Sequence, residues 1–335
     1  MSSRYTLCVV FIASITPLSW GQGLAQQGPL EGRDDPTATK LPQTAGLHGE
    51  ILVKGAWSSA SGSLAPVPEG GQVDNRVFRN PYFGITYTLP ADWIETYKGP
   101  PPSDSGQYVL AQLGPAETFK GPARGSVLIT AQDMFFTASP ARNAKELIDY
   151  MQATLQSDYR VEVPPTEVQV AHRCFTFFKY WSPIAQLHWY VLATQIRCHT
   201  LQIVLTSRDT HVLDSLMRDL NSMRLPDEVS PRGTAGGGAF PVCVADYARD
   251  ENILARVDPV FAAHRSNPVP VRIVIDTGGA VKHIHLLSAF PDQAKAVTDA
   301  LRQWKFRPYR QNGQPLEIET GILFGTTPHL RGANN

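Results

Sequence analysis

The sequence has no surplus of charge of either sign. Its 335 residues include 30 Lys and Arg and 30 Asp and Glu, so the formal net charge at pH 7 is zero. Proteins that bind nucleic acids or anionic membranes through charge usually carry a basic surplus or a polybasic block. The composition therefore argues against a nucleic-acid partner and against a protein that binds membrane surfaces.

The short motifs of common catalytic sites are also missing. The sequence has no Gly-x-Ser-x-Gly elbow, no His-Glu-x-x-His helix and no Gly-x-x-x-x-Gly-Lys phosphate loop. Only His283 and His285 form a close histidine pair, and on a strand their rings share one face. A metal ion is one interpretation of this pair; a polar outer face is the other, which we prefer because no third ligand is nearby. We expect no enzyme, no cofactor and no metal.

Cysteine is scarce, and its spacing excludes Cys-x-x-Cys redox and zinc motifs. The chain has four cysteines, and no two of them are separated by only two residues. Cys8 lies in the predicted signal peptide, so Cys174, Cys198 and Cys243 remain. Cys174 and Cys198 lie at opposite ends of a predicted meander of strands and are candidates for a disulfide. They form one if the register of the strands places them side by side.

The N-terminus has the pattern of a secretory signal peptide. Arg4 precedes a short apolar run from Leu7 to Trp20, and Gly23-Leu24-Ala25 offers small residues for cleavage after Ala25. The run is too short to span a bilayer comfortably. We expect a periplasmic or secreted protein, with no stable membrane insertion once residues 1–25 are removed. The alternative is an inner-membrane protein anchored by an uncleaved N-terminal segment.

Two stretches poor in large apolar residues divide the chain. Residues 26–75 are rich in Gly, Pro, Ser, Gln and Thr, and we interpret them as a flexible arm because they lack apolar surface to offset the entropy of ordering. Residues 226–239 contain three consecutive glycines and two prolines, which is typical of a linker. The sequence thus predicts folded domains at residues 76–225 and 240–325, followed by a short tail at 326–335.

The C-terminal domain is predicted to contain a hairpin, a helix and a last strand. Residues 271–288 alternate around a glycine turn, as expected for a β-hairpin. Pro291 suits the first position of a helix that extends to Trp304 with apolar residues at spacings of three and four. Residues 316–324 alternate again. The result is an antiparallel sheet with one helix packed on it.

This domain resembles the C-terminal domain of the TonB family. Three separated motifs carry the resemblance, in order: Asp276…Gly279-Ala-Val281, Trp304-Lys305-Phe306-Arg307-Pro308 and Asn312-Gly313-Gln314-Pro315. In that family the domain recognises short peptides of outer-membrane receptors. The resemblance therefore implies a protein-interaction module of the cell envelope, associated with TonB-dependent transport across the outer membrane.

The resemblance also indicates where a partner would bind. We expect the last strand at the edge of the sheet, where unpaired N–H and C=O groups let an extended peptide, for example from an outer-membrane receptor, add as a further strand. The residues predicted to contact the partner, from the edge strand and its flank, are Leu316, Glu317, Ile318, Glu319, Thr320, Ile322, Arg307 and Arg310.

The first domain is predicted to be an antiparallel sheet flanked by helices, which places the whole protein in the α+β class. We expect helices at about 141–156 and after Asp209, a suitable N-cap. The opening strand, Phe83-Gly-Ile-Thr-Tyr-x-Leu-Pro90 with Trp93, resembles the first strand of the PsbP-like family. That family includes binding and assembly proteins and implies no catalytic residues.

Aromatic residues gather in the three later strands predicted for this domain, at about 168–180, 187–196 and 201–207, near His172, His188 and His199. They suggest an alternative function, a periplasmic small-ligand-binding protein whose pocket these rings line. An ordinary aromatic sheet core is the plainer interpretation.

Overall fold

The computed structural model describes residues 51–52, 60–61, 67–68, 71–97, 107–116, 125–136, 141–226, 240–261, 268–287 and 289–325. The predicted signal peptide, the predicted linker from residue 227 onwards and the predicted tail lie outside the described residues, as does most of the predicted arm. In the described part of the chain, no helix combines the length and the apolar character needed to cross a membrane.

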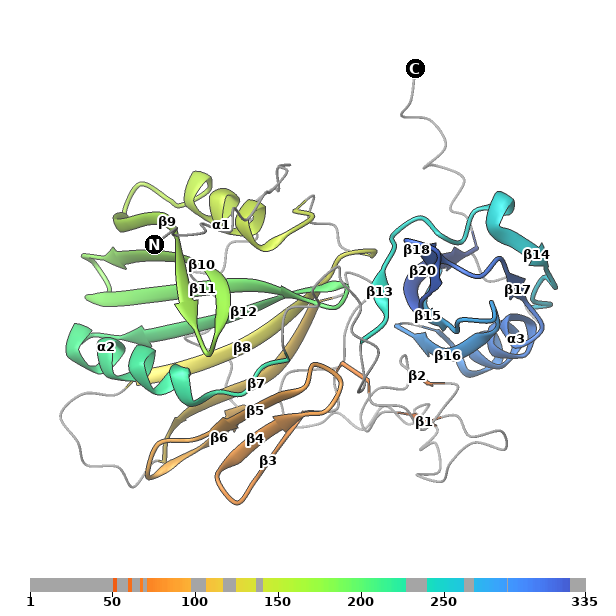
Figure 1. Cartoon of the computed structure of the whole chain (residues 1–335). Coiled ribbons are helices and arrows are strands. Elements are labelled where there is room, and N and C mark those ends of the chain that lie inside the picture. The colour runs from red at the N-terminus through yellow and green to blue at the C-terminus, as the bar shows by residue number, and fades with distance from the viewer. Residues whose placement is uncertain are drawn as a thin grey trace, which may run out of the picture.

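A seven-stranded antiparallel sheet forms the larger unit (Figure 1), with the strand order β6-β7-β8-β12-β11-β10-β9. Its strands are β6 (Trp93–Tyr97), β7 (Gln107–Pro115), β8 (Gly125–Asp133), β9 (Arg160–Val170), β10 (Arg173–Ser182), β11 (Leu187–Ile196) and β12 (His199–Ser207). The run from Val168 to Tyr180, predicted as one strand, is instead the end of β9 and most of β10. The chain turns between them because Ala171 and His172 both adopt positive φ.

Two helices pack on opposite faces of this sheet. Helix α1 (Ala144–Ala153) packs over β10 and β11, where Ile148 meets Phe178. Helix α2 (Thr210–Asp219) lies over β12 on the other face and begins at the predicted N-cap, since Asp209 accepts a hydrogen bond from the His211 amide at 2.8 Å. A 3-10 turn (Leu220–Ser222) follows α2 and completes this larger core.

A small three-stranded sheet extends the larger core at its N-terminal end. It contains β3 (Gln72–Asp74), β4 (Val77–Asn80) and β5 (Ile85–Thr88). The alternation predicted for the opening strand is confirmed, because Ile85 and Tyr87 point into the core. Thr86 also exchanges backbone hydrogen bonds with Arg224, which ties the first strands to the end of the larger unit.

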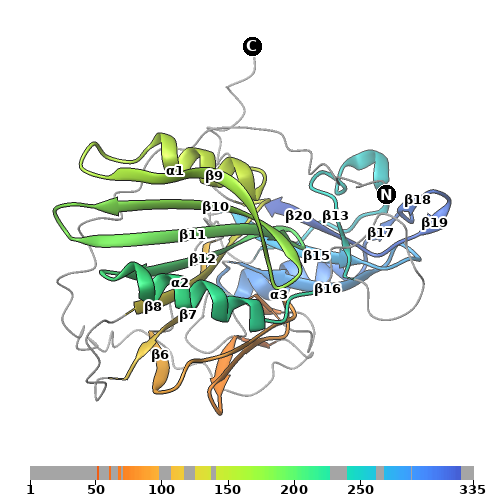
Figure 2. The same cartoon turned by 60° about the vertical axis from the view of Figure 1, so that its left-hand side comes forward.

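The smaller unit is built around the antiparallel strands β16-β15-β20, with helix α3 on one face (Figure 2). Its main elements are β15 (Val269–Ile275), β16 (Val281–Leu286), α3 (Pro291–Leu301) and β20 (Ile318–Phe324). They confirm the predicted order of hairpin, helix and last strand, and α3 begins at Pro291 as predicted. Short elements complete the unit: β13 (Val242–Cys243), a 3-10 turn (Asp250–Asn252), β14 (Ile253–Ala255), β17 (Lys305–Phe306), β18 (Arg310–Gln311) and β19 (Gln314–Pro315).

Short strands of the chain lie beside both outer strands of this three-stranded sheet. On one side β2 (Ala60–Ser61) pairs with β16, and β1 (Ile51–Leu52) pairs with β2. On the other side β13 pairs with β20. The predicted flexible arm therefore contributes two short strands to the smaller unit.

Candidate functional site at the junction of the two units

The smaller sheet has two buried faces, and only one of them meets its own helix. Val271, Ile273 and Ile275 on β15 pack with α3 in the small core. Arg272 points to the opposite face, where it is 2% exposed, and Glu319 on the neighbouring β20 is 1% exposed. Their contacts, described next, come from the larger unit, so the two sheets meet across this polar face.

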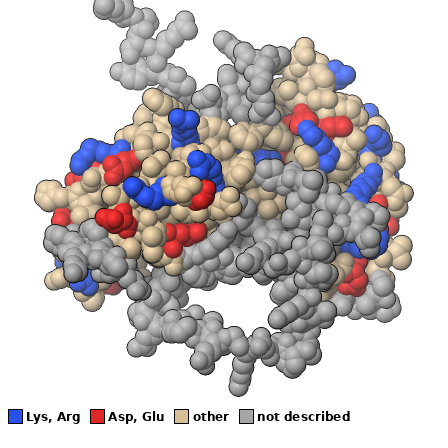
Figure 3. All heavy atoms as spheres, turned by 90° about the horizontal axis from the view of Figure 1, so that it is seen from below, with Lys and Arg blue, Asp and Glu red and all other residues tan. Residues whose placement is uncertain are grey.

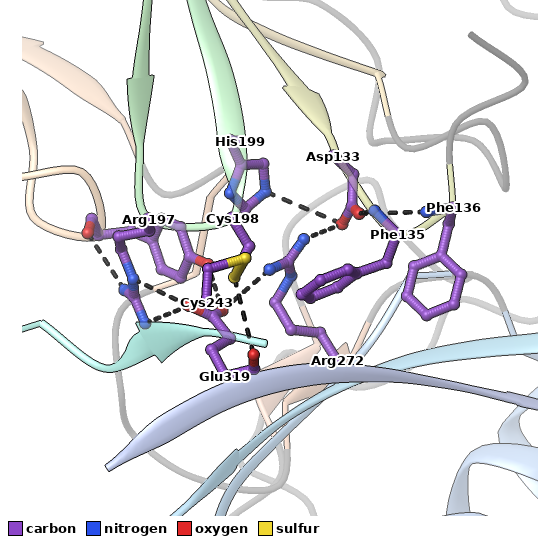
Figure 4. A network of polar contacts seen from close by, with 10 residues as sticks. Asp133, Phe135, Phe136, Arg197, Cys198, His199, Cys243, Arg272 and Glu319 are labelled. Carbon is purple, nitrogen blue, oxygen red and sulfur yellow. Dashed lines mark hydrogen bonds and ion pairs between the residues drawn. A yellow bond between two sulfur atoms is a disulfide. The ribbon is translucent and has the colours of Figure 1, made fainter. Parts of the chain in front are cut away.

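Glu319 is the centre of the junction (Figure 4). One carboxylate oxygen accepts a hydrogen bond from the Tyr82 hydroxyl at 2.6 Å and another from Arg272 at 3.1 Å. The other oxygen accepts a hydrogen bond from Nε of Arg197 at 3.1 Å and forms an ion pair with its Nη2 at 3.0 Å. The guanidinium of Arg197 also lies 3.8 Å from the centroid of the Tyr82 ring. Three residues from the two units thus satisfy one buried carboxylate.

Arg272 connects this group to the end of strand β8. Its guanidinium forms an ion pair with Asp133, whose other oxygen accepts hydrogen bonds from the backbone amides of Phe135 and Phe136. The Phe135 ring lies over the Arg272 guanidinium, with 4.8 Å between the charge and the ring centroid. Asp133 and Glu319 therefore balance the charges of Arg197 and Arg272 inside the junction.

His199 stands at the side of this cluster as a neutral imidazole. It is fully buried, its Nε2 lies 3.9 Å from Asp133, and the rings of Tyr82, Phe83 and Tyr108 meet it edge to face. Burial, followed by the charges of Arg272 and Arg197, holds the pKa of His199 well below its ordinary value. A proton on this ring would add a third positive charge to the cluster.

The electrostatics of Glu319 favour its charged form. Burial alone would raise the pKa of this carboxyl, but the charges of Arg272 and Arg197 together outweigh burial and lower the pKa. Burial raises the pKa of Tyr82, so its hydroxyl stays protonated and donates to Glu319. Because a buried pair is destabilised strongly when one partner is lost, this arrangement fixes how the two units meet.

A disulfide crosses the same junction, and it differs from the predicted one. Cys198, in the turn between β11 and β12, is bonded to Cys243 on β13, with 5.3 Å between their Cα atoms. The Sγ atom of Cys198 lies 3.7 Å from the carbonyl oxygen of Glu319. The predicted bridge between Cys174 and Cys198 is wrong, because docking of the two units brings Cys243 to Cys198.

A cavity of about 220 Å³ opens beside the cluster. The larger unit contributes Tyr82 and Arg197 to its wall, and the smaller unit contributes His283 and His285. Burial, followed by the charge of Lys282, lowers the pKa of His283. His285 is buried rather than on a polar outer face. In the described residues, no three or more His, Cys, Asp or Glu side chains are grouped to hold a metal ion.

The predicted edge position of the last strand is wrong over its first half. β20 pairs antiparallel with β15 along its whole length, and β13 pairs parallel with it at Ile318 and Glu319. A segment of the chain that showed no strand pattern therefore occupies this part of the edge. Glu319 and Thr320 are buried within the protein, so neither decorates an exposed edge.

The remaining predicted contact residues are scattered. Ile318 and Ile322 face the small core, and Glu317 pairs with Lys282 at 2.7 Å near the surface. Arg307 and Arg310 are exposed, and each donates a hydrogen bond to a nearby backbone carbonyl, of Glu251 and Gly313. Leu316 lies before β20, and its amide donates to the Tyr309 carbonyl. The structure thus does not bring these residues together as one surface.

The aromatic residues of the larger unit do not converge on one pocket. Phe175 belongs to the main core, whereas Phe178 belongs to the cluster under α1 on the other face of the sheet. His188 stacks on Trp181 at the surface end of β10 and β11. The plainer interpretation, an aromatic sheet core, describes these residues.

Sequence reasoning missed Asp133, Arg197, Tyr82 and Arg272 as members of the central cluster. Arg272 and Asp133 are separated by 139 positions along the chain, and no local motif links them. The one signal was a charged residue within the apolar alternation of β15, which is as typical of a solvent-exposed face as of a docking face.

Comparison with known proteins agrees with the predicted resemblance of the C-terminal domain. Residues 263–325 match the family described as the Gram-negative bacterial TonB protein C-terminal. No curated protein matches the chain. The solution structure of cyanobacterial PsbP (CyanoP) from Synechocystis sp. PCC 6803 is similar at 15% identity. The similarity covers 49% of this chain and 99% of that chain, with a TM-score of 0.32. The smaller unit therefore contains a TonB C-terminal-like domain, a type of envelope domain that mediates protein–protein interaction.

Proposed function

We propose that this is an exported envelope protein whose TonB C-terminal-like domain binds an extended segment of a protein partner along the outer edge of β20. The observation that carries the proposal is that β13 covers only the first part of this edge. We further infer that the partner belongs to TonB-dependent transport, such as an outer-membrane receptor. The family match at residues 263–325 supports this inference.

The hydrogen bonds of β13 define which residues of β20 point outward. The amides of Val242 and Val244 donate to the carbonyls of Glu317 and Glu319, at 2.8 and 3.0 Å. Because backbone groups alternate along a strand, Gly321 and Leu323 are the next outward residues. Among the described residues, no strand pairs with β20 beyond Glu319 on this side. Leu323 is 50% exposed, which suits the addition of a further strand.

The long edge strand of the larger sheet is a poorer candidate. Among the strands that the structure describes, β9 pairs with β10 alone, but it carries Pro164 and Pro165, which cannot donate ladder hydrogen bonds. The charges of Glu162 and Glu167 also lie on this strand, and charged edges discourage strand addition. The described residues on the face seen in Figure 3 mix positive and negative side chains without a large patch of one sign, which gives no support to a partner recognised by charge alone.

Two features support export. The first is the signal-peptide pattern of residues 1–25. The second is the disulfide between Cys198 and Cys243, because disulfides persist mainly in oxidising compartments such as the periplasm. We infer an interaction role rather than energy transduction, because transduction in the TonB family needs an uncleaved membrane helix. Sequencing the N-terminus of protein from fractionated cells tests this: a start near Gln26 in the periplasm supports it, and a start at Met1 in the inner membrane contradicts it.

The binding proposal is tested with fluorescent peptides copied from periplasm-facing segments of the host's outer-membrane receptors. Leu323→Pro removes one outward N–H and leaves the ladder to β15 intact, because residue 323 does not donate to that strand. We expect this variant to bind the peptides about tenfold more weakly, which corresponds to about 1.4 kcal/mol. Leu323→Thr, which keeps the N–H, is the matched control. Equal affinity of the two variants, or no receptor peptide that binds, contradicts the proposal.

A further inference from the structure

Strand β13 is already a strand added to the edge of β20, supplied by the chain itself. We propose that the outer edge from Glu317 to Leu323 is one continuous peptide site, that β13 fills its first half, and that the Cys198–Cys243 disulfide holds β13 there. Opening the disulfide would make the whole edge available to a partner. This inference rests on the proposed function, since it concerns the regulation and the partner of the same edge.

Strand β13 is short, and its pairing with β20 covers only Val242 and Cys243. The hydrogen bonds there include those from the Val242 and Val244 amides, and one from the Thr320 hydroxyl to the Ala245 carbonyl at 3.2 Å. The side chains of Val242 and Val244 are only partly buried against the small core. A two-residue strand with such contacts is the kind of edge element that another strand can replace.

The disulfide favours the position of β13 beside β20 because it joins β13 to a buried turn of the larger unit. Cys198 is 0% exposed and lies in the tight turn between β11 and β12, whereas Cys243 is half-buried on β13. The bond closes a loop with a sequence separation of 45 residues, and such closure keeps the two ends together. With the bond intact, β13 therefore stays at high local concentration beside β20.

The sequence of β13 indicates which partner fits its place. Val242 and Val244 contact the small core, and Cys243 between them points to the larger unit, where it meets Cys198. The strand runs parallel to β20. We therefore expect an extended partner segment with β-branched apolar residues at alternate positions and a small residue between them. Beyond this place, the segment would continue past Gly321 and Leu323.

Opening the disulfide requires a dithiol reductant and follows ordinary thiol–disulfide exchange. A thiolate of the dithiol attacks Sγ of Cys243, the less buried of the two residues, and forms a mixed disulfide while Cys198 leaves as a thiolate. The second thiol of the reductant then attacks the mixed disulfide and releases Cys243. The protein gains two electrons and two protons in all, and the dithiol is oxidised to its own disulfide.

The probe is a fluorescein-labelled peptide with the sequence of residues 240–246 and serine in place of cysteine. Its anisotropy is measured with the oxidised protein, the dithiothreitol-treated protein and the Cys243→Ser variant. We expect the last two to bind at least about tenfold more tightly than the oxidised protein. Cys174→Ser, which retains the disulfide, is the matched control and should behave as the wild type in both redox states. Equal binding in all states overturns the inference.

Hydrogen exchange provides a second test that does not depend on a ligand. Reduction should speed exchange of the Val242 and Val244 amides at least about tenfold, while the Ile273 amide in the β15–β20 ladder is unchanged. Faster exchange at Ile273 as well overturns the inference, because the disulfide would then stabilise the whole unit. Receptor peptides that bind the oxidised protein, without any effect of reduction, uphold the proposed function and refute the redox control. If no receptor peptide binds but reduction tightens binding of the 240–246 peptide, the receptor is refuted as the partner and the exchangeable strand is upheld.

Discussion

Replacing Glu319 with glutamine tests whether one buried carboxylate holds the two units together. Glutamine keeps the shape of the side chain but removes the charge that Arg197 and Arg272 share, at 3.0 and 3.1 Å. Asp133 would then be left to balance the buried guanidinium of Arg272 and the partly exposed guanidinium of Arg197. Loss of one partner from a buried ion pair costs about 3–5 kcal/mol. We expect the free energy of unfolding in urea to fall by this amount at neutral pH.

The same strand offers a matched control two residues away. Glu317 pairs with Lys282 at 2.7 Å, but both side chains are substantially exposed, and exposed pairs contribute about 1 kcal/mol or less. Glu317→Gln should therefore leave the urea midpoint nearly unchanged. If the unfolding free energy of Glu319→Gln lies within about 1 kcal/mol of that of Glu317→Gln, the buried carboxylate does not hold the junction together, and its central role in docking is refuted.

Three further predictions concern the same junction. The free energy of unfolding should fall as the pH drops below about 6.5, because the unfolded chain, where the pKa of His199 is ordinary, takes up the proton before the folded protein does. Urea unfolding across this pH range measures the loss, and a free energy that does not change with pH contradicts the prediction. Gly321→Ala should cost about 1–3 kcal/mol, because a Cβ there would lie 2.8 Å from Cβ of Phe135. Gly278→Ala, whose Cβ would have only one neighbour, at 3.4 Å, is the control in thermal melts. Peptide mapping without reduction should find Cys198 joined to Cys243, and a bridge that contains Cys174 would contradict the structure.

The parts of the fold that the sequence predicts well are those fixed by local chemistry. Pro291 begins α3 and Asp209 caps α2 as predicted, since both effects depend only on neighbouring backbone groups. The alternation in residues 271–275 identified β15 and its core face correctly. The TonB resemblance was likewise carried by turns and short motifs within one domain, and the family match covers the same region.

The failures occur where the residues give no local signal or where distant segments decide the outcome. Ala171 and His172 turn the chain between β9 and β10, but neither is a residue that usually signals a turn. β13 is too short for an alternating pattern, so nothing in the sequence indicated that it would cover β20. The disulfide partner of Cys198 was missed for a related reason, because only docking of the two units brings Cys243 to it.

The polar face of the smaller sheet explains why docking and partner binding need not compete. Arg272 and Glu319 lie on the face that meets the larger unit, whereas the N–H and C=O groups of Gly321 and Leu323 point sideways along the sheet, at right angles to that face. α3 covers the opposite face. Because both faces of the sheet are covered, a partner would bind the sheet along its edge. The length of edge available then depends on whether β13 stays in place.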